Sequence, residues 1–250
     1  ALEQGASVAV IDNPDYAIEG KTILVPDTLL ALQELAREWR RTLNIPIIAI
    51  TGTNGKTTTK ELTAAVLATR YKVHYTQGNL NNQIGVPLTL LQLTRAHEIA
   101  IIEMGASHPG DIKELVEIAE PTCGLITNVG RAHLQGFGSF EGVMSTKAEL
   151  YDYLRQHDGF IFRNTDNPYL AQMAGELQTI AYTTGTMPEQ SHLVGTYNAE
   201  NVSAAICVGA HFGIPYQQAL ETVCAYEPSN KRSQLLQTAR NTIVVDAYNA

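Results

Sequence analysis

The sequence predicts an α/β fold in which a parallel sheet is covered by helices on both faces. Three observations predict it. Segments of strand and helix character alternate from Pro46 onward. The expected strands at residues 46–50, 99–104 and 124–129 are almost continuously apolar, as strands buried on both faces are. A glycine-rich turn, residues 51–59, joins the first of these strands to a helix, which is the setting of a phosphate-binding loop.

The remaining elements follow from local patterns. Residues 7–11 and 22–25 are expected to be short strands, and the helix after them is expected to be capped by Thr28. Its apolar residues recur every three or four positions, so it buries one stripe. Further strands are expected at residues 72–75, 159–162, 179–182 and 242–245, and helices at 56–69, 111–119, 142–155, 168 onward and 198–212. Residues 1–44 are therefore expected to be the tail of a small N-terminal α/β domain, residues 45–240 a central domain, and residues 241–250 a linker.

Composition excludes several classes of protein. The chain has 250 residues, 44% of them hydrophobic and 17% charged, as a globular protein of one or two domains has. Its net charge of −8 argues against non-specific binding to nucleic acid. No apolar run approaches the roughly 20 residues of a membrane span, and the start lacks signal-peptide features. The single, unpaired spacing of Cys123, Cys207 and Cys224 predicts reduced thiols and a cytoplasmic protein.

The glycine-rich turn departs from the usual phosphate-loop spacing. That pattern has four residues between its first glycine and the Gly-Lys pair, whereas two residues separate Gly52 from Gly55 here. If the turn binds phosphates, its N–H groups and the helix N-terminus surround them, Lys56 reaches the β- and γ-phosphates, and Thr57 binds Mg²⁺. The alternative is an ordinary strand-to-helix turn with an exposed lysine.

Other polar residues follow the carboxyl ends of the expected strands, where ligands of parallel sheets bind. Glu103 ends one strand, and residues 128–133 follow another. Because Mg²⁺ prefers oxygen ligands, Glu103 is the more natural metal ligand. His133 is either a second ligand or a hydrogen-bonded structural residue, and the residues alone leave both open.

Several stretches together resemble the Mur ligases and their relatives, the folylpolyglutamate synthetases. In family order they are residues 51–57, 103–106, 128–133, 147–149, 198–205 and 246–250. Residues 78–91 and 246–250 also resemble the branch that adds D-alanyl-D-alanine. The resemblance covers nearly the whole chain. It implies a P-loop ATPase domain of the Mur ligase type, preceded by a UDP-sugar-binding domain and followed by a Rossmann-like domain that is absent here.

The resemblance also implies an activity. The expected reaction is the ATP-dependent ligation of D-alanyl-D-alanine to UDP-N-acetylmuramoyl-tripeptide through an acyl phosphate, in peptidoglycan precursor synthesis. The expected cofactors are ATP and two Mg²⁺ ions, and the enzyme is expected to be a monomer that neither enters membranes nor binds nucleic acid. Because the third domain is absent, the chain by itself is expected to be incomplete for catalysis.

The roles of individual residues are likewise implied by the resemblance. The catalytic group would be Lys56, His133 and Lys147, with Lys147 carbamylated. ATP would contact Gly52, Thr53, Asn54, Gly55, Lys56, Thr57, Thr58, Asn201, Arg232 and Asp246. Magnesium would be held by Thr57, Glu103, His133 and Lys147. Substrate would contact Asn79, Asn81 and Asn82.

Each of these roles has a plainer alternative. Lys147 lies on an expected helix, where a solvated lysine is ordinary. Asn201 could be a helix cap, Arg232 a loop arginine, and the three asparagines a polar loop, while His108 is expected to be a structural loop residue. Residues 183–197 are shorter than the family's connection, which indicates an omitted or trimmed segment. Alternatives for the whole protein are another ligase of the superfamily and a nucleotide-binding module without catalysis.

Overall fold

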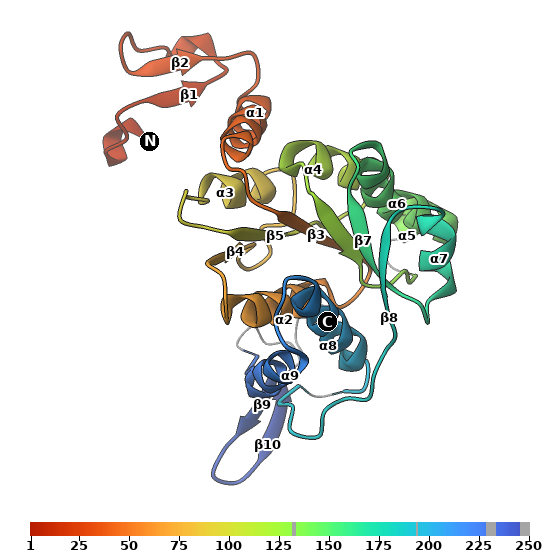
Figure 1. The fold of residues 1–250 in the computed structure, drawn as a ribbon. Coiled ribbons are helices and arrows are strands. Elements are labelled where there is room, and N and C mark those ends of the chain that lie inside the picture. The colour runs from red at the N-terminus through yellow and green to blue at the C-terminus, as the bar shows by residue number, and fades with distance from the viewer. Residues whose placement is uncertain (132–133, 194, 229–233, 246–250) are drawn as a thin grey trace.

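The computed structural model describes residues 1–131, 134–193, 195–228 and 234–245. Its main sheet has six parallel strands in the order β4-β5-β3-β6-β7-β8 (Figure 1). These strands are β3 (Ile47–Thr51), β4 (Val73–Tyr75), β5 (Ile99–Glu103), β6 (Cys123–Ile126), β7 (Phe160–Asn164) and β8 (Thr179–Tyr182). The predicted α/β class with a parallel sheet is therefore confirmed.

Helices cover both faces of this sheet, giving three layers (Figure 1). One face carries α3 (Gly85–Leu91), α4 (Asp111–Ala119), α5 (Leu134–Phe137), α6 (Phe140–Gln156) and α7 (Pro168–Ala174). The other carries α2 (Lys56–Ala68), α8 (Asn198–His211) and α9 (Tyr216–Ala225). Because alternate side chains of a strand point to opposite faces, Ile47 and Ala49 join the first core and Ile48 and Ile50 the second. This double burial explains the continuous apolar strands of the sequence.

The N-terminal residues form a small unit of their own. Strands β1 (Ala9–Ile11) and β2 (Thr22–Leu24) pair in parallel, and α1 (Thr28–Arg41) follows them. Two short 3₁₀ turns, η1 (Leu2–Gln4) and η2 (Pro14–Tyr16), complete the unit. The predicted cap was wrong by one residue, because the Asp27 carboxylate accepts the N–H of Leu30 at 2.9 Å. The Thr28 hydroxyl instead donates to Asp12 at 2.8 Å.

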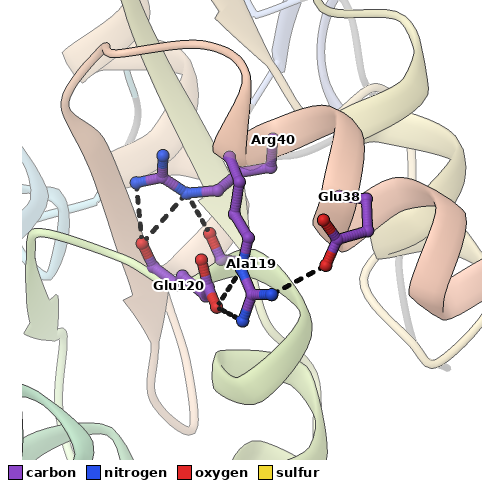
Figure 2. Close-up of polar contacts among 5 residues, drawn as sticks. Glu38, Arg40, Ala119 and Glu120 are labelled. Carbon is purple, nitrogen blue, oxygen red and sulfur yellow. Dashed lines mark hydrogen bonds and ion pairs between the residues drawn. The ribbon is translucent and has the colours of Figure 1, made fainter.

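Two arginines at the end of α1 attach this unit to α4 (Figure 2). The Arg40 guanidinium donates to the main-chain carbonyls of Ala119 and Glu120, at 3.1 and 2.9 Å for the shortest bond to each. Arg41 pairs with the Glu120 carboxylate at 2.6 Å and with Glu38 at 2.7 Å. Cations favour a helix C-terminus, where carbonyl groups have no partner within the helix. Helix α1 therefore caps α4 as it packs against the central domain.

Helices α3, α5 and α9 and strand β9 (Gln234–Gln237) were not predicted. Strand β9 pairs antiparallel with the expected strand β10 (Thr242–Val245). Residues 183–193 and 195–197 contain no helix or strand. Cys123, Cys207 and Cys224 are free thiols, as expected. In the described part of the chain, no helix combines the length and the hydrophobicity that crossing a membrane requires.

Candidate functional site

The glycine-rich turn between β3 and α2 is held in a fixed conformation. Gly52 and Gly55 have φ of 141° and 79°, values that side chains other than glycine rarely adopt. A Cβ on Gly52 would lie 2.0 Å from the Thr127 hydroxyl. That hydroxyl donates to the Asn54 carbonyl at 2.6 Å, and the Asn128 side chain accepts the Asn54 N–H at 3.0 Å. The turn is therefore fastened to the segment that follows β6.

Lys56 begins α2 and folds back over this turn. Its ammonium donates to the carbonyls of Gly52 and Thr53 at 2.9 and 3.0 Å. The α2 N-terminus directs unpaired N–H groups to the same place. A cation and a helix N-terminus together favour an anion, and phosphate is the anion that such turns bind.

A cleft of about 480 Å³ opens beside the turn. It is lined by Thr53, Asn54, Gly55, Lys56, Thr57, Asn81, Asn82, Gln83, Glu103, Gly105, Ala106, Ser107, Asp111, Glu114 and Leu115. The sheet topology thus brings together the turn, Glu103 and two of the three predicted asparagines. Asn79 does not line the cleft. Four further lining residues were not predicted, although two of them lie in the first turn of α4 directly after Gly110: Gln83, Ser107, Asp111 and Glu114.

Glu103, at the end of β5, faces the first turn of α2. It is 1% exposed, and its Oε1 accepts the Thr57 hydroxyl at 3.2 Å and the Asn81 amide at 2.9 Å. Its Oε2 is buried without a hydrogen-bond donor. A carboxylate and a hydroxyl side by side, with acceptor capacity left over, suit a hard cation such as Mg²⁺. No cluster of three or more His, Cys, Asp or Glu that could hold a metal occurs among the described residues.

Lys147 lies within α6 and is not the solvated lysine that its helix alone would suggest. It is 2% exposed. Burial, and secondly the positive charge of Lys56, lower its pKa to about 7, against the opposing effect of Asp111 and Glu149. A cavity of about 20 Å³ separates Lys147 from the turn, with Phe137 on its wall. A large fraction of this amine is therefore neutral, and so nucleophilic, near pH 7.

Asn201 supports the turn from the α8 side. It is 4% exposed, and its side-chain oxygen accepts the Thr59 hydroxyl at 3.0 Å while its amide donates to Asn198 at 2.9 Å. The same oxygen would lie 2.3 Å from a Cβ on Gly55. The geometry adds a buttressing contact to the predicted role of Asn201, and its contact with adenine stays a prediction.

The asparagine-rich loop has a structural part as well. Asn82 accepts the N–H groups of Ile84 and Gly85 at 3.1 and 2.9 Å, which starts α3. Asn81 orients Glu103 as described above. Substrate contacts of these asparagines stay a prediction. His108 is a loop residue, as expected, since its N–H donates to Asp111 at 2.9 Å.

Three predicted site residues, His133, Arg232 and Asp246, lie outside the described residues.

Comparison with known proteins decides the family. The family model of the Mur ligase middle domain matches residues 50–189. This chain belongs to the Mur ligase family. The loop, the glutamate and the buried lysine described above therefore belong to a Mur ligase middle domain.

Individual Mur ligases resemble the chain along its whole length. The UDP-N-acetylmuramoyl-tripeptide–D-alanyl-D-alanine ligases of Bacillus subtilis and Synechocystis are 38% and 39% identical to it over all of its residues. A crystal structure of MurF from Acinetobacter baumannii superposes on the whole chain with a TM-score of 0.87 at 28% identity. MurF ligase from Thermotoga maritima, in complex with ADP, does so with a TM-score of 0.87 at 27% identity. The chain spans 59 to 64% of the length of these four relatives.

Proposed function

We propose that the protein containing this chain joins D-alanyl-D-alanine to UDP-N-acetylmuramoyl-tripeptide at the expense of ATP, in the synthesis of the peptidoglycan precursor. The observation that carries the proposal is 38% identity over the whole chain to the Bacillus subtilis ligase of that name. The cleft supports it, because a phosphate-binding turn and a carboxylate share one wall with the asparagine-rich loop.

The turn residues and Lys56 would bind the phosphates of ATP. Their N–H groups and the ammonium neutralise the negative charge that builds up while a phosphoryl group moves to the tripeptide carboxylate. Thr57 and Glu103 would hold Mg²⁺, which supplies further charge neutralisation when bound. The amino group of D-alanyl-D-alanine would then attack the acyl phosphate. Asn201, Arg232 and Asp246 are proposed to contact the rest of the nucleotide.

Lys147 is proposed to be carbamylated. The neutral amine attacks the carbon of CO₂ and its nitrogen releases a proton to solvent, so the resulting carbamate carries a negative charge. Its pKa of about 7 keeps enough of the neutral form for this reaction at physiological pH. With His133, the carbamate oxygens would provide ligands for a second Mg²⁺. Incubation with ¹³C-bicarbonate and NMR of the wild type and Lys147→Met tests this: a carbamate signal is expected in the wild type alone, and its absence there would refute the carbamate.

The domain boundaries, the cytoplasmic location and the monomeric state are further parts of the proposal. Residues 1–44 would end the UDP-sugar-binding domain, residues 45–240 form the ATP-binding domain, and residues 241–250 lead to a third domain. Free thiols at all three cysteines suit a reducing compartment. Light scattering on the purified protein checks the monomer.

Phosphate release from ATP by the complete gene product tests the activity. The assay contains Mg²⁺ and UDP-N-acetylmuramoyl-tripeptide, with and without D-alanyl-D-alanine, and a parallel assay contains folate and glutamate. Release that requires both muramoyl substrate and dipeptide supports the proposal. Release with folate and glutamate would make the protein a folylpolyglutamate synthetase, and ATP binding without release would make it a non-catalytic module. The 250-residue chain alone is expected to bind ATP without ligating.

A further inference from the structure

We propose that Lys60 is a positioning residue for the metal site: a buried lysine that fixes the orientation of the Glu103 carboxylate from the interior side. The inference rests on the proposed function, in which Glu103 binds the Mg²⁺ of Mg²⁺-ATP. It adds a residue outside the phosphate-binding turn to the machinery of the cleft.

The burial of Lys60 calls for a reason. Its side chain is 0% exposed, and its ammonium makes no hydrogen bond. Lysine is almost never fully buried unless it is paired, since removing an ammonium from water carries a large desolvation penalty. An apolar residue of similar length would fill the same space without that cost. A negatively charged group nearby is therefore expected to compensate the positive charge of Lys60.

The groups nearest to the Lys60 ammonium are two carboxylates and an aromatic ring. The Lys60 ammonium lies 3.6 Å from Glu103 Oε2 and 3.2 Å from Glu61 Oε1, with the Tyr75 ring on one side at 5.7 Å from its centroid. Glu103 Oε2 is itself a buried oxygen without a hydrogen-bond donor. Two buried atoms that make no hydrogen bond, the Lys60 ammonium and Glu103 Oε2, thus face each other.

Helix geometry explains how the carboxylate is held. Thr57 and Lys60 are three residues apart, so both lie on the face of α2 that meets the end of β5. The Thr57 hydroxyl contacts Oε1 on the cleft side, and the Lys60 ammonium faces Oε2 on the interior side. The two contacts bracket the Glu103 carboxylate, fixing its orientation and leaving Oε1 turned toward the cleft. Residues that orient a metal ligand in this way commonly affect metal affinity by about 10- to 100-fold.

Glu61 does not account for the burial by itself. Its side chain is 20% exposed, so it reaches solvent and could pair with Lys60 at the surface. Glu103, by contrast, is 2% exposed in its side chain and has no cation closer than Lys60 in the described structure. The pair with Glu103 is therefore the one that places Lys60 in the interior.

The test measures ATP affinity of the complete gene product with Mg²⁺ and with a chelator instead. The dissociation constant of ATP with the chelator, divided by the constant with Mg²⁺, reports the contribution of the metal to affinity. This ratio is independent of catalysis. Lys60→Met, which keeps the length and removes the charge, is expected to reduce that ratio by about tenfold or more. Lys60→Gln is a second neutral variant, whose amide can hydrogen-bond to polar groups in the interior. Lys113→Met makes the same change on α4 at a side chain 66% exposed, and is expected to leave the ratio unchanged.

The outcomes separate positioning from a merely structural role. Neutral variants with lowered thermal stability but the wild-type ratio would overturn the inference, as would a ratio that increases. In the ligase assay, Lys60→Met should need about tenfold more Mg²⁺ for half-maximal rate with an unchanged KM for the muramoyl substrate. A wild-type protein that gains nothing from Mg²⁺ in ATP affinity would overturn the proposed function, and this inference with it.

Discussion

At the scale of single residues, Lys147 links stability to pH. Its pKa is about 7 in the folded protein, against about 10.4 in the unfolded chain. Between these values the unfolded chain binds a proton that the folded protein does not, so the free energy of unfolding rises with pH. Urea unfolding in CO₂-free buffer at about pH 7 and pH 9 should show a rise about 2 kcal/mol larger in the wild type than in Lys147→Met. An equal rise in both proteins would contradict the low pKa.

The same residues show what a sequence can and cannot predict. The order Gly-Lys-Thr after an apolar strand predicts the phosphate-binding turn, and the carboxyl end of the apolar strand at residues 99–104 predicts Glu103. Lys60 carries no such signal, because a lysine in the first turns of an amphipathic helix is ordinarily solvated. Its burial depends on Glu103 of β5, which is 43 residues further along the chain and meets it only in the folded sheet. Lys147 is a related case, since only its tertiary neighbours lower its pKa.

At the scale of elements, the start of α2 depends on close contact with α8. Gly55 precedes α2 with a φ of 79°, and a Cβ there would meet the Asn201 side-chain oxygen at 2.3 Å. Gly55→Ala therefore combines backbone strain with a collision. Gly110 precedes α4 in the same way, with a φ of 90° and nothing within 4 Å of an added Cβ.

Comparing the two alanine variants separates strain from collision. Gly110→Ala should lower the free energy of unfolding by about 1 kcal/mol, the cost of a left-handed alanine. Gly55→Ala should cost about 1 to 3 kcal/mol more and weaken ATP binding at least about tenfold, because Asn201 or the turn must shift. Urea unfolding and ATP titration measure both quantities. Equal effects of the two substitutions would show that the contact with Asn201 does not hold the turn.

The elements also mark the limit of prediction by periodicity. Doubly buried strands and long amphipathic helices were recognised because their pattern repeats over many residues. Helix α3 is seven residues long and contains Pro87 in its first turn, so its pattern is indistinguishable from that of a loop. Helix α9 carried a usable signal, since Ala219 and Val223 lie four residues apart after Pro215 and both are buried. The cap at Asp27 was missed because Thr28 beside it is an equally good capping residue.

At the scale of the whole molecule, α4 connects the cleft to the N-terminal unit. Asp111 and Glu114, at the start of α4, line the cleft, and Gln33 of α1 donates to Glu114 at 2.6 Å. The two arginines at the end of α1 hold the other end of α4 (Figure 2). Helix α1 therefore contacts α4 at both ends, and the N-terminal unit should move with the central domain as one body.

Neighbouring arginines allow this attachment to be tested with one substitution at two sites. Arg40 is half-buried and donates to main-chain carbonyls at the end of α4, where helix carbonyls lack partners within the helix, so Arg40→Met should lower the free energy of unfolding by about 2 to 3 kcal/mol. Arg41 is 50% exposed and pairs with the carboxylates of Glu38 and Glu120, so Arg41→Met should cost clearly less than Arg40→Met.

Hydrogen exchange should locate the loss. In Arg40→Met, amides of α1 should exchange faster than in the wild type, while those of β3 and β5 keep their rates. The reason is that the contacts of Arg40 with α4 lie outside the core of the sheet. ATP affinity should be unchanged, since neither arginine contacts the turn or Glu103. Faster exchange throughout the sheet would mean that α1 belongs to the core of the central domain. Exchange in α1 that is the same in both arginine variants and the wild type would mean that its apolar stripe alone, with Ala36 buried, suffices to hold it.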